Sequence, residues 1–574
     1  MKINPITRDI IRNALATVAD NMIVTVVQTA RSPIVKNKLD FSTAICTADG
    51  DLAGQGLALP AHLGAIMPPL KAVIEDFKGD INPGDVFINN DPYRGGSHLI
   101  DIFMFQPIFD GGDLVAFASI IIHHTDIGGR VAGGQASDNT EIYQEGLRIP
   151  PLKIVEKGVR NDTVFKMIEA NVRVPHRVIG DVMAQLASLR LAEAEMQKLI
   201  SEYGGATLKA YMGDLIDYTE RLTRAAITEL PDGEAEFEDV IDDDGVSDDP
   251  IVIKCKLTIK GDEVTADFAG TSAQTKSSIN PNVEFTWSCV YAAIRTVLDP
   301  LHPNNYGFHK PINIVTTPGT FVHPVFPAAF AARGLASHRV RQVVLGAMAK
   351  LMPERMPACY GGSECMVGFY GRKENGDMFL CNEGQNTTSL GGGPDRDGQD
   401  GAAFPLSNVA NTPIELIETE NPILVEEYGF LPSTGGPGRY RGGLGVVKQW
   451  RCLTDDVTAQ LRSDRYHTPP WGLWGGKPGA PGRIIVNPGA PSEYQPPSKG
   501  RVQLNAGDVI RTEMPGAGGF EPAFQRDPEA VADDVRQEKM TIDHARTAYG
   551  VVVDPKTFEV NGVETAALRA KAAE

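Results

Sequence analysis

Apolar residues recur every three or four positions over residues 5–32. This period matches the 3.6 residues of a helical turn, so the pattern predicts one amphipathic helix that Pro33 ends. Residues 161–203 show the same period, but Pro175 and Gly180 interrupt it. We therefore expect two core-facing helices in that stretch rather than one.

Strand-like patterns fill the interval between these helices. Residues 35–56 predict a hairpin that turns at Asp49-Gly50, and the apolar run 114–124 is typical of a buried strand. From Ile251 onward, apolar and polar residues alternate around Lys260-Gly261-Asp262, which predicts a second hairpin. The first half of the chain therefore mixes strands with long helices.

Turn-forming residues and charges mark further segments. The polar stretch 137–151 is a candidate lid at the border of an active site. The acidic stretch 230–250 predicts a solvated loop at a domain boundary. A helix is expected over residues 331–353, with Ser337 as its N-cap. Beyond Tyr360, Gly and Pro dominate, which we interpret as turns between short strands.

At 574 residues the chain is too long for a single hydrophobic core. The patterns predict an α+β fold class, in which mixed α/β domains follow one another and the central and C-terminal regions are rich in strands. We expect four parts. They are an N-terminal domain with long helices (residues 1–230), a mixed α/β middle domain (231–355), a Gly/Pro-rich β-region (356–525) and a helical tail (526–574).

Charge and cysteine content narrow the class of protein. The net charge is −19 and no surface rich in Lys and Arg is apparent, so no nucleic-acid partner is expected. The seven cysteines are scattered without a CxxC pair, which fits a reducing compartment. The N-terminus lacks the pattern of a signal peptide, and no apolar run of membrane-spanning length is expected. We predict a cytoplasmic protein without a membrane contact.

The densest group of candidate functional residues lies in residues 89–129. This stretch holds three of the chain's eleven histidines and several aspartates, between apolar runs and Gly-Gly pairs. Neutral imidazole and carboxylate are ligands for a divalent ion, and they are commonly held at strand ends and on short loops. The stretch therefore predicts a metal site. The alternative is that these polar residues are satisfied at the mouth of a sheet without an ion.

The direction of the side chains narrows the choice of ligands. Adjacent residues of a strand point to opposite faces, so only one of His123 and His124 can readily bind the ion. His98 and Asp101 lie three apart, on what the preceding glycines indicate is an irregular loop. We take His98, Asp101 and His123 as candidate metal ligands. His124 and Asp126 then become candidates that support the ligands or act in catalysis.

Several enzyme classes lack their sequence motifs in this chain. No GxxxxGK[ST] phosphate loop is present, so a nucleotide site in this chain is not expected. The GxSxG nucleophile elbow and the HExxH zinc motif are also absent. Chemistry in this chain is therefore expected to be metal-centred or free of a cofactor.

Several motifs follow one another in order along nearly the whole chain. They are PITRDIIRNAL with TARSP, KLDFSTAICTADGDLAGQ, PAHLGAIM, NNDPYRGGSHLIDIFMFQPIF, HHTDIGG, NVRVPHRVIGDVMAQ, DFAGTSAQ, GGPGRYRGGLG and PGAGGFEPAFQRDP. In this order they resemble the hydantoinase B family, also called the 5-oxoprolinase or acetone carboxylase α-type family.

The resemblance implies an activity and a partner. Members pair with a hydantoinase A-type subunit that binds ATP and Mg, which implies an (αβ)2 assembly. The pairs open lactams and cyclic imides such as 5-oxoproline, N-methylhydantoin or caprolactam, and related complexes carboxylate acetone or acetophenone. We therefore expect the metal-binding subunit of an ATP-dependent amidohydrolase. The length of the chain favours a hydrolase, because the acetone carboxylase subunit of this type is longer.

The resemblance also implies a set of ligands and a metal. The family's metal ligands map onto Asp40, His98, Asp101 and His123, with zinc as the first choice of ion and manganese as the second. Asp40 precedes a predicted strand, where a carboxylate by itself is more often a turn residue. His124 and Asp126 stay as catalytic candidates that move the proton of an attacking water. Two alternatives stay open, a subunit of a ketone carboxylase and a non-catalytic scaffold.

Overall fold

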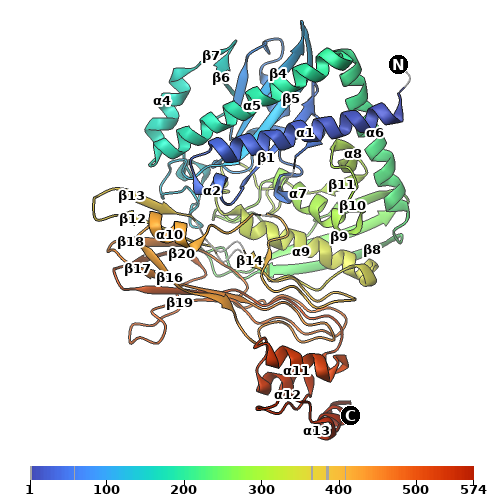
Figure 1. The fold of residues 1–574 in the computed structure, drawn as a ribbon, viewed down its shortest axis with the longest axis vertical. Coiled ribbons are helices and arrows are strands. Elements are labelled where there is room, and N and C mark those ends of the chain that lie inside the picture. Colours follow the sequence, from blue (N-terminus) through green and yellow to red (C-terminus); the bar gives the residue numbers. More distant parts are fainter. Residues whose placement is uncertain (1–2, 57–58, 363–365, 383–386, 408, 574) are drawn as a thin grey trace. The chain divides into compact units, whose positions relative to one another are not determined.

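The computed structural model describes residues 3–56, 59–362, 366–382, 387–407 and 409–573. The chain forms two compact units, and each is described here by itself. Unit 1 comprises Met1–Phe237, Ile253–Val344 and Pro405–Pro413, and unit 2 comprises Glu238–Val252, Leu345–Phe404 and Ile414–Glu574. Helices and sheets alternate along the chain (Figure 1), so the predicted mixed α/β, multi-domain class is confirmed. The predicted four-part division stays a prediction.

A seven-stranded antiparallel sheet forms the centre of unit 1. Its strands lie in the order β2-β1-β5-β4-β3-β6-β7, so the two long strands β4 and β5 occupy the middle. The bounds are β1 Phe41–Thr47, β2 Leu52–Gln55, β3 Val86–Asn89, β4 Asp101–Asp110, β5 Asp113–His123, β6 Leu152–Glu156 and β7 Val159–Arg160. The predicted hairpin of residues 35–56 is confirmed as β1 and β2.

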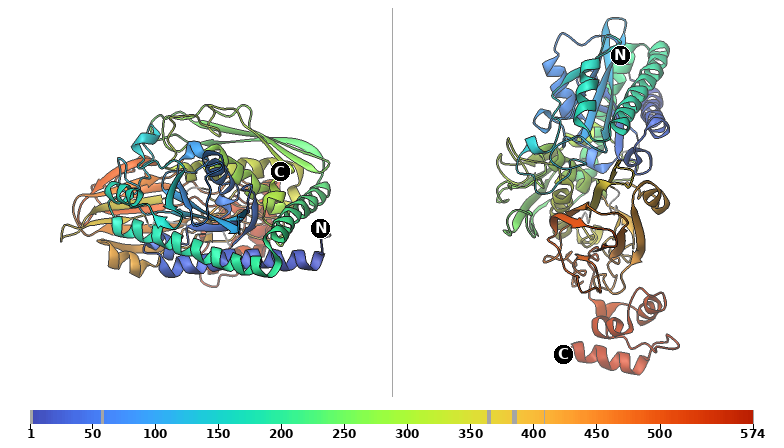
Figure 2. Two further views of the ribbon diagram at one scale, coloured as in Figure 1. Left: turned by 90° about the horizontal axis from the view of Figure 1, so that it is seen from above. Right: turned by 90° about the vertical axis from the view of Figure 1, so that its left-hand side faces the viewer.

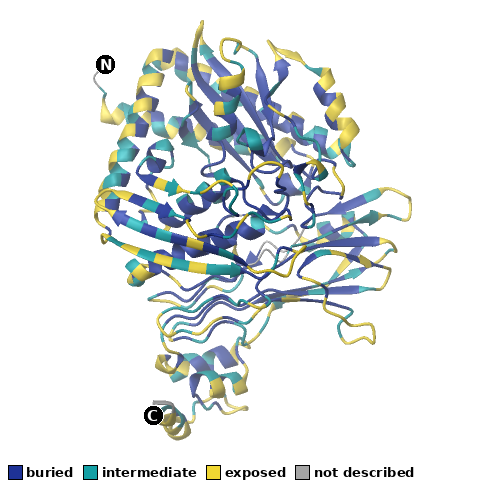
Figure 3. Ribbon diagram, turned by 180° about the vertical axis from the view of Figure 1, so that it is seen from behind, coloured by how far each residue is buried: buried dark blue, intermediate teal, exposed yellow. Residues whose placement is uncertain are grey.

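Both faces of this sheet are buried. Ile102 and Met104 of β4 pack with the helices α1 (Pro5–Thr29) and α5 (Pro175–Tyr203). The alternate residues of β4 pack instead with α3 (Met67–Asp76) on the opposite face. The central strands are therefore dark in the burial colouring of Figure 3, and α1 and α5 run side by side over one face in Figures 1 and 2.

Unit 1 also contains a smaller sheet and further helices. A smaller sheet has the order β11-β10-β9-β8, and its β9–β10 hairpin confirms the turn predicted at Lys260-Gly261-Asp262. Its strands are β8 Gly233–Ile241, β9 Ile251–Lys260, β10 Glu263–Asp267 and β11 Ile312–Val315, of which residues 238–241 and 251–252 belong to unit 2. The other helices are α2 Pro33–Lys36, α4 Asp162–Asn171, α6 Gly205–Thr228, α7 Val283–Ile294, α8 Tyr306–His309 and α9 Arg333–Leu351, whose last turns belong to unit 2.

Unit 2 contains two four-stranded sheets whose apolar residues form one core around Trp450. The orders are β13-β12-β18-β20 and β16-β17-β21-β19. The bounds are β12 Met366–Arg372, β13 Met378–Cys381, β14 Thr387–Thr388, β15 Ala402–Ala403, β16 Ile423–Phe430, β17 Val446–Cys452, β18 Val457–Arg462, β19 Arg483–Val486, β20 Lys499–Leu504 and β21 Val509–Glu513. The helices are α10 Ile414–Glu420, α11 Pro528–Arg536, α12 Ile542–Tyr549 and α13 Gly562–Ala573.

The glycine-rich segments of unit 2 do more than turn the chain. A Cβ added to Gly442 would lie 1.9 Å from the carbonyl oxygen of Ala517, and one added to Gly516 would lie 1.9 Å from that of Thr434. These glycines let irregular backbone segments pack directly on one another, where any side chain would separate them. The interpretation of the glycines as turns between strands was therefore incomplete.

Three local predictions were wrong. The predicted loop 230–250 contains β8, because its apolar and acidic residues alternate as in a strand. Gly180 lies inside α5 and does not end it, whereas the break falls before Pro175 as expected. Ser337 lies inside α9, where its hydroxyl donates a hydrogen bond to the carbonyl oxygen of Arg333 rather than capping the helix.

Among the described residues, α1 is the one helix that is long and apolar enough to cross a membrane by length and composition alone. No run of that kind was expected from the sequence. The helix contributes Leu15, Met22 and Val26 to the core of unit 1, and core helices of soluble proteins pass the same test. The cytoplasmic location stays a prediction.

The burial of both sheet faces predicts a large effect of truncating Phe117 in the middle of β5. Phe117 is fully buried, and we expect Phe117→Ala to lower the free energy of unfolding by about 3–5 kcal/mol, because the cavity cannot close. Val159→Ala, at a position in β7 that is 71% exposed, is expected to change it by less than about 0.5 kcal/mol. Urea denaturation followed by circular dichroism measures both, and equal effects would contradict the prediction.

Candidate metal centre

Pairing between β4 and β5 brings two of the candidate ligands together. Asp101 begins β4, His123 ends β5, and the two residues lie directly opposite each other in the antiparallel ladder. Side chains of directly opposed residues share a face of the sheet. The register thus places a carboxylate and an imidazole at one end of the two central strands.

His98 reaches the same place from a short turn before β4. The amide N–H of Asp101 donates a 3.0 Å hydrogen bond to the carbonyl oxygen of His98, which closes this turn. Upstream, Gly95 has φ +82°, and a Cβ there would lie 2.5 Å from the backbone of Pro68, so only glycine fits. The irregular loop expected before Asp101 is therefore present, and it carries His98 back towards the sheet.

The three side chains form a compact, buried group. Candidate ligand atoms of His98, Asp101 and His123 all lie within 4.8 Å of one another. The Nε2 atom of His98 is 3.2 Å from Oδ2 of Asp101, and the rings of the two histidines are 5.2 Å apart. Two ligands that are each about 2.1 Å from one ion lie at most about 4.2 Å apart, so small side-chain shifts suffice to hold a metal. Two imidazoles and a carboxylate suit zinc or manganese.

Asp101 is held by one of its oxygens. Its Oδ2 atom lies 2.6 Å from a guanidinium nitrogen of Arg333 and also accepts a hydrogen bond from Ser97. Its Oδ1 atom is buried and has no hydrogen-bond partner among the described residues. Burial by itself would raise the pKa of Asp101, but His98 and Arg333 outweigh it and hold that pKa well below its usual value. The group therefore offers an ionised oxygen that a cation would satisfy.

His98 is oriented by a backbone carbonyl. Its Nδ1 atom lies 3.3 Å from the carbonyl oxygen of Ala331, which places a proton on Nδ1 and leaves the Nε2 lone pair towards Asp101. Burial and the charge of Arg333 lower the pKa of His98, against the opposing effect of Asp101. The lowered pKa favours the neutral imidazole, and this is the form that binds a metal.

His123 lies beside Gln135 and Asp40. The amide nitrogen of the Gln135 side chain is 2.5 Å from Nε2 of His123, and the backbone N–H of His123 donates to the carbonyl oxygen of Asp40. Among the described side chains, the carboxylate of Asp40 is not one of the three that cluster. Asp40 as a fourth ligand therefore stays a prediction. The sequence analysis did not select Gln135 as a site residue, because nothing in its glycine-rich loop indicates a role beside His123.

The two catalytic candidates lie outside this group. His124 points to the face of the sheet that α1 and α5 cover, where its Nε2 atom is 3.2 Å from the side-chain oxygen of Gln185 in α5. Asp126 accepts hydrogen bonds from the backbone N–H groups of Gly133 and Arg173, at 2.9 and 2.5 Å. The opposite directions of His123 and His124 match the strand alternation that was expected. The catalytic roles of His124 and Asp126 stay predictions.

His62 is a further histidine close to this group. Its Nδ1 atom lies 2.7 Å from the hydroxyl oxygen of Ser42, and the residue is buried. Burial lowers the pKa of His62 to about 4, with Asp101 acting in the opposite direction and Arg333 and His98 adding to the decrease. His62 is therefore neutral and senses the charges of the group. In the sequence, the motif PAHLGAIM was the one indication that His62 belongs with the candidate site residues.

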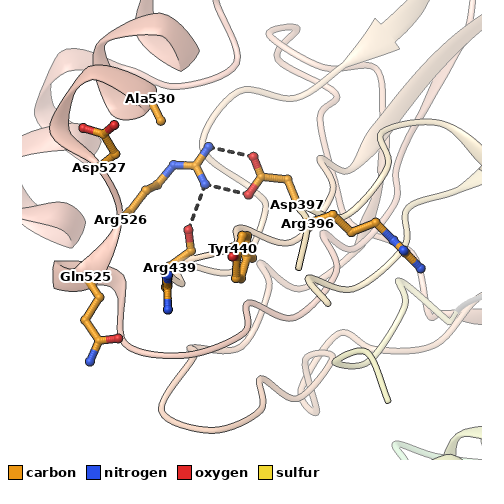
Figure 4. A pocket seen from close by; sticks show the side chains of 8 residues that line it. All are labelled: Arg396, Asp397, Arg439, Tyr440, Gln525, Arg526, Asp527 and Ala530. Atoms are coloured by element: carbon orange, nitrogen blue, oxygen red, sulfur yellow. Dashed lines mark hydrogen bonds and ion pairs between the residues drawn. The ribbon is translucent and has the colours of Figure 1, made fainter. Parts of the chain in front are cut away.

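Unit 2 contains a cavity of about 480 Å³ at the start of the C-terminal helices. Figure 4 shows that Arg526 in its wall points to Asp397, with two ion-pair contacts of 2.6 and 2.8 Å. A second carboxylate, Asp534, also contacts Arg526. The charge of Arg526 is thus compensated, and this guanidinium ties the helices to the rest of unit 2.

A model of the Hydantoinase B/oxoprolinase family matches residues 4–522 of the chain. The chain belongs to this family. A putative D-/L-hydantoinase subunit from Pseudomonas sp. (strain NS671) is 32% identical over 96% of each chain. The expected resemblance is thereby confirmed.

Two solved structures resemble the fold of this family member. The ATP-dependent caprolactamase from Pseudomonas jessenii superposes with a TM-score of 0.92 at 27% identity, over 99% of this chain and 100% of that chain. A nucleotide-free acetone carboxylase has the same TM-score at 20% identity, over 99% of this chain and 83% of its own. The second likeness shows the fold alone.

The Arg333–Asp101 ion pair predicts that removing the guanidinium of Arg333 lowers the stability of the protein. In metal-free protein, we expect Arg333→Met to lower the free energy of unfolding by roughly 3–5 kcal/mol, because Asp101 would keep a buried charge without its partner. Arg160→Met, which breaks an exposed ion pair with Asp162, is the matched control and should have little effect. Urea denaturation with EDTA present measures both, and a wild-type value for Arg333→Met would contradict the prediction.

Proposed function

We propose that this chain is the metal-holding subunit of an ATP-dependent amidohydrolase that opens lactams or cyclic imides. The substrate class is that of 5-oxoproline, N-methylhydantoin or caprolactam. The observation that carries the proposal is the buried group of His98, Asp101 and His123, in a chain that matches a hydantoinase subunit over its length. Zinc is the first choice of ion and manganese the second.

The residues of the group suit hydrolysis. A bound divalent ion would polarise a carbonyl oxygen and lower the pKa of water. His98 and His123 supply imidazole nitrogens, and Asp101 supplies a negative charge. Arg333 occupies Oδ2 of Asp101 and leaves Oδ1 for a cation. Burial of all three side chains keeps bulk water from competing with the ligands.

ATP and Mg are assigned to a partner, a hydantoinase A-type subunit, in an (αβ)2 assembly. Two observations support this assignment: relatives are named as subunits, and this sequence contains no phosphate-loop motif. Hydrolysis of an unstrained amide can be uphill, so the partner's ATP would phosphorylate the imidate oxygen of the ring. Water would then add to the carbon that bears this oxygen, and the ring C–N bond would break with a proton passing to the nitrogen, which leaves an acyl phosphate. A second water would hydrolyse the acyl phosphate to the carboxylate and inorganic phosphate.

His124 and Asp126 are proposed to move the proton of the attacking water. Their hydrogen bonds to Gln185, Gly133 and Arg173 also suit a purely structural role. The two roles differ in the pH–rate profile, since loss of a general base removes one limb of that profile. Full turnover with an unchanged profile in His124→Ala would remove His124 from the mechanism.

A ketone carboxylase is the alternative enzyme. The likeness to acetone carboxylase supports it at the level of the fold. The present chain spans the whole caprolactamase chain but 83% of the acetone carboxylase chain, which favours the hydrolase. The third possibility is a non-catalytic scaffold. In that case the metal is purely structural, so every variant that loses the metal should also unfold.

Substitution of the ligands tests the metal centre. We expect His98→Ala, Asp101→Asn and His123→Ala to lower zinc or manganese affinity at least tenfold while circular dichroism stays that of the wild type. His176→Ala, at an exposed position of α5, is the matched control. Metal content after dialysis is measured by mass spectrometry. Variants that unfold whenever they lose metal would favour the scaffold, and variants that keep metal would remove the centre.

Reconstitution with the partner tests the activity. Co-expressed with a hydantoinase A-type subunit, the chain is expected to release ADP and a ring-opened product from 5-oxoproline, N-methylhydantoin or caprolactam. The ligand variants should abolish product formation. Labelled bicarbonate is supplied in parallel with acetone and acetophenone. Incorporation of the label into product, without lactam opening, would replace the hydrolase by the carboxylase.

A further inference from the structure

The orientation of His98 depends on a segment without regular secondary structure. Its Nδ1 atom faces the carbonyl oxygen of Ala331, in the residues just before α9 begins at Arg333. This segment therefore presents a carbonyl to His98, and Arg333, the first residue of α9, presents a guanidinium to Asp101. An irregular backbone holds such a position only where neighbouring groups fix each peptide.

Glu145 fixes the peptides that precede this carbonyl. One oxygen of its carboxylate accepts hydrogen bonds from the backbone N–H groups of both Phe330 and Ala331, each at 2.6 Å. On the other side of Ala331, the N–H of Ala332 donates to the carbonyl oxygen of Ser278. Hydrogen bonds thus fix the backbone on both sides of Ala331, and the side chain of Glu145 accepts those on the N-terminal side.

The placement of Glu145 is itself tightly determined. The residue is 1% exposed and follows the short 3-10 helix Ile142–Gln144. A Cβ on Gly129 would lie 2.5 Å from the backbone of Glu145, so the two backbones are in direct contact. The N–H of Ile142 donates to the carbonyl oxygen of Pro327, which adds a second link between this loop and the segment before α9.

Anchoring a loop with a buried carboxyl group lowers the stability of the protein. Burial raises the pKa of Glu145 to about 8, although the N–H groups of Ala331 and Phe330 act in the opposite direction. Its second oxygen is buried and has no hydrogen-bond partner among the described residues. Retaining such a group costs stability. A role at the neighbouring site accounts for that cost better than packing does.

We propose that Glu145 is a positioning residue for His98, which it orients by fixing the Ala331 carbonyl through the backbone N–H groups of Phe330 and Ala331. The proposal rests on the proposed function, because it assigns His98 to a metal centre. Groups of this kind behind a metal-bound histidine set the tautomer and direction of the ring, and their loss typically lowers metal affinity 10- to 100-fold. Glu145 would act at one remove, through the backbone.

The test compares three substitutions at Glu145 with one nearby control. Glu145→Ala removes the acceptor oxygen. Glu145→Asp shortens the side chain by one methylene and so moves the acceptor oxygen away from the two N–H groups. Glu145→Gln keeps an oxygen that can accept both N–H groups. Glu141→Gln, in the same loop and without a described side-chain contact to the segment before α9, is the matched control. Zinc affinity is measured by competition with a chelator, and the visible spectrum of bound cobalt reports the geometry of the ligands.

We expect Glu145→Ala and Glu145→Asp to lower zinc affinity at least tenfold and to change the cobalt spectrum. Glu145→Gln should stay within about threefold of the wild type, as Glu141→Gln should, because the acceptor oxygen is retained. Wild-type affinity and spectrum in Glu145→Asp would overturn the proposal, even if Glu145→Ala does not fold. A Glu145→Gln variant as defective as Glu145→Asp would also overturn it, since the hydrogen bonds would then not be the cause.

A metal-free measurement separates this proposal from the proposed function. In protein labelled with ¹⁵N-histidine, the signal of His98 is assigned by its loss in His98→Gln. We expect a proton on Nδ1 in the wild type and a mixture of tautomers in Glu145→Asp. If the wild type binds no metal, the proposed function fails. If the wild type binds metal but His98 keeps its tautomer in Glu145→Asp, the positioning role fails.

Discussion

The pairing of Asp101 with His123 across two central strands is the constraint on which the site depends. A shift of the register by one residue would send each side chain to the other face of the sheet. Apolar residues on both faces of β4 and β5 oppose such a shift, because Ile102 packs with the helices and Phe103 packs with α3. The hydrophobic core therefore sets the position of the polar group at its edge.

Charge is buried at this edge only where it is compensated. Asp101 is ionised inside the protein because Arg333 contacts one of its oxygens, and Arg333 in turn lies 3.7 Å over the ring of Phe285. Burial and the charge of Arg333 lower the pKa of His98, although the ionised Asp101 beside it acts in the opposite direction. A cation between these groups would satisfy the Oδ1 atom of Asp101, which has no hydrogen-bond partner among the described residues. In unit 2, the buried charge of Arg526 is likewise compensated, because Asp397 and Asp534 both contact its guanidinium.

Segments far apart in the chain converge on His98 and Asp101. The loop that ends at Glu145 and the segment before α9 each supply one half of a hydrogen-bonded junction beside the sheet. Neither segment contains a strand, so side-chain and backbone contacts join the two segments in place of a strand ladder. Through this junction, Glu145 is linked to the carbonyl oxygen of Ala331 that faces His98, although Glu145 itself bonds to the backbone of Phe330 and Ala331.

The sequence by itself determined the elements with a strong period and the residues that are candidate ligands. Helical spacing located α1 and α5, strand patterning located β5, and residue type selected His98, Asp101 and His123. Local pattern failed where a residue's role depends on its surroundings, as at Ser337 inside α9 and in the acidic strand β8. Only the tertiary structure decided that Gln135 lies beside His123, that Arg333 contacts Asp101 and that Glu145 contacts the backbone of Phe330 and Ala331. Their contacts join residues more than ten positions apart, and no spacing along a chain encodes which distant segments will share a core.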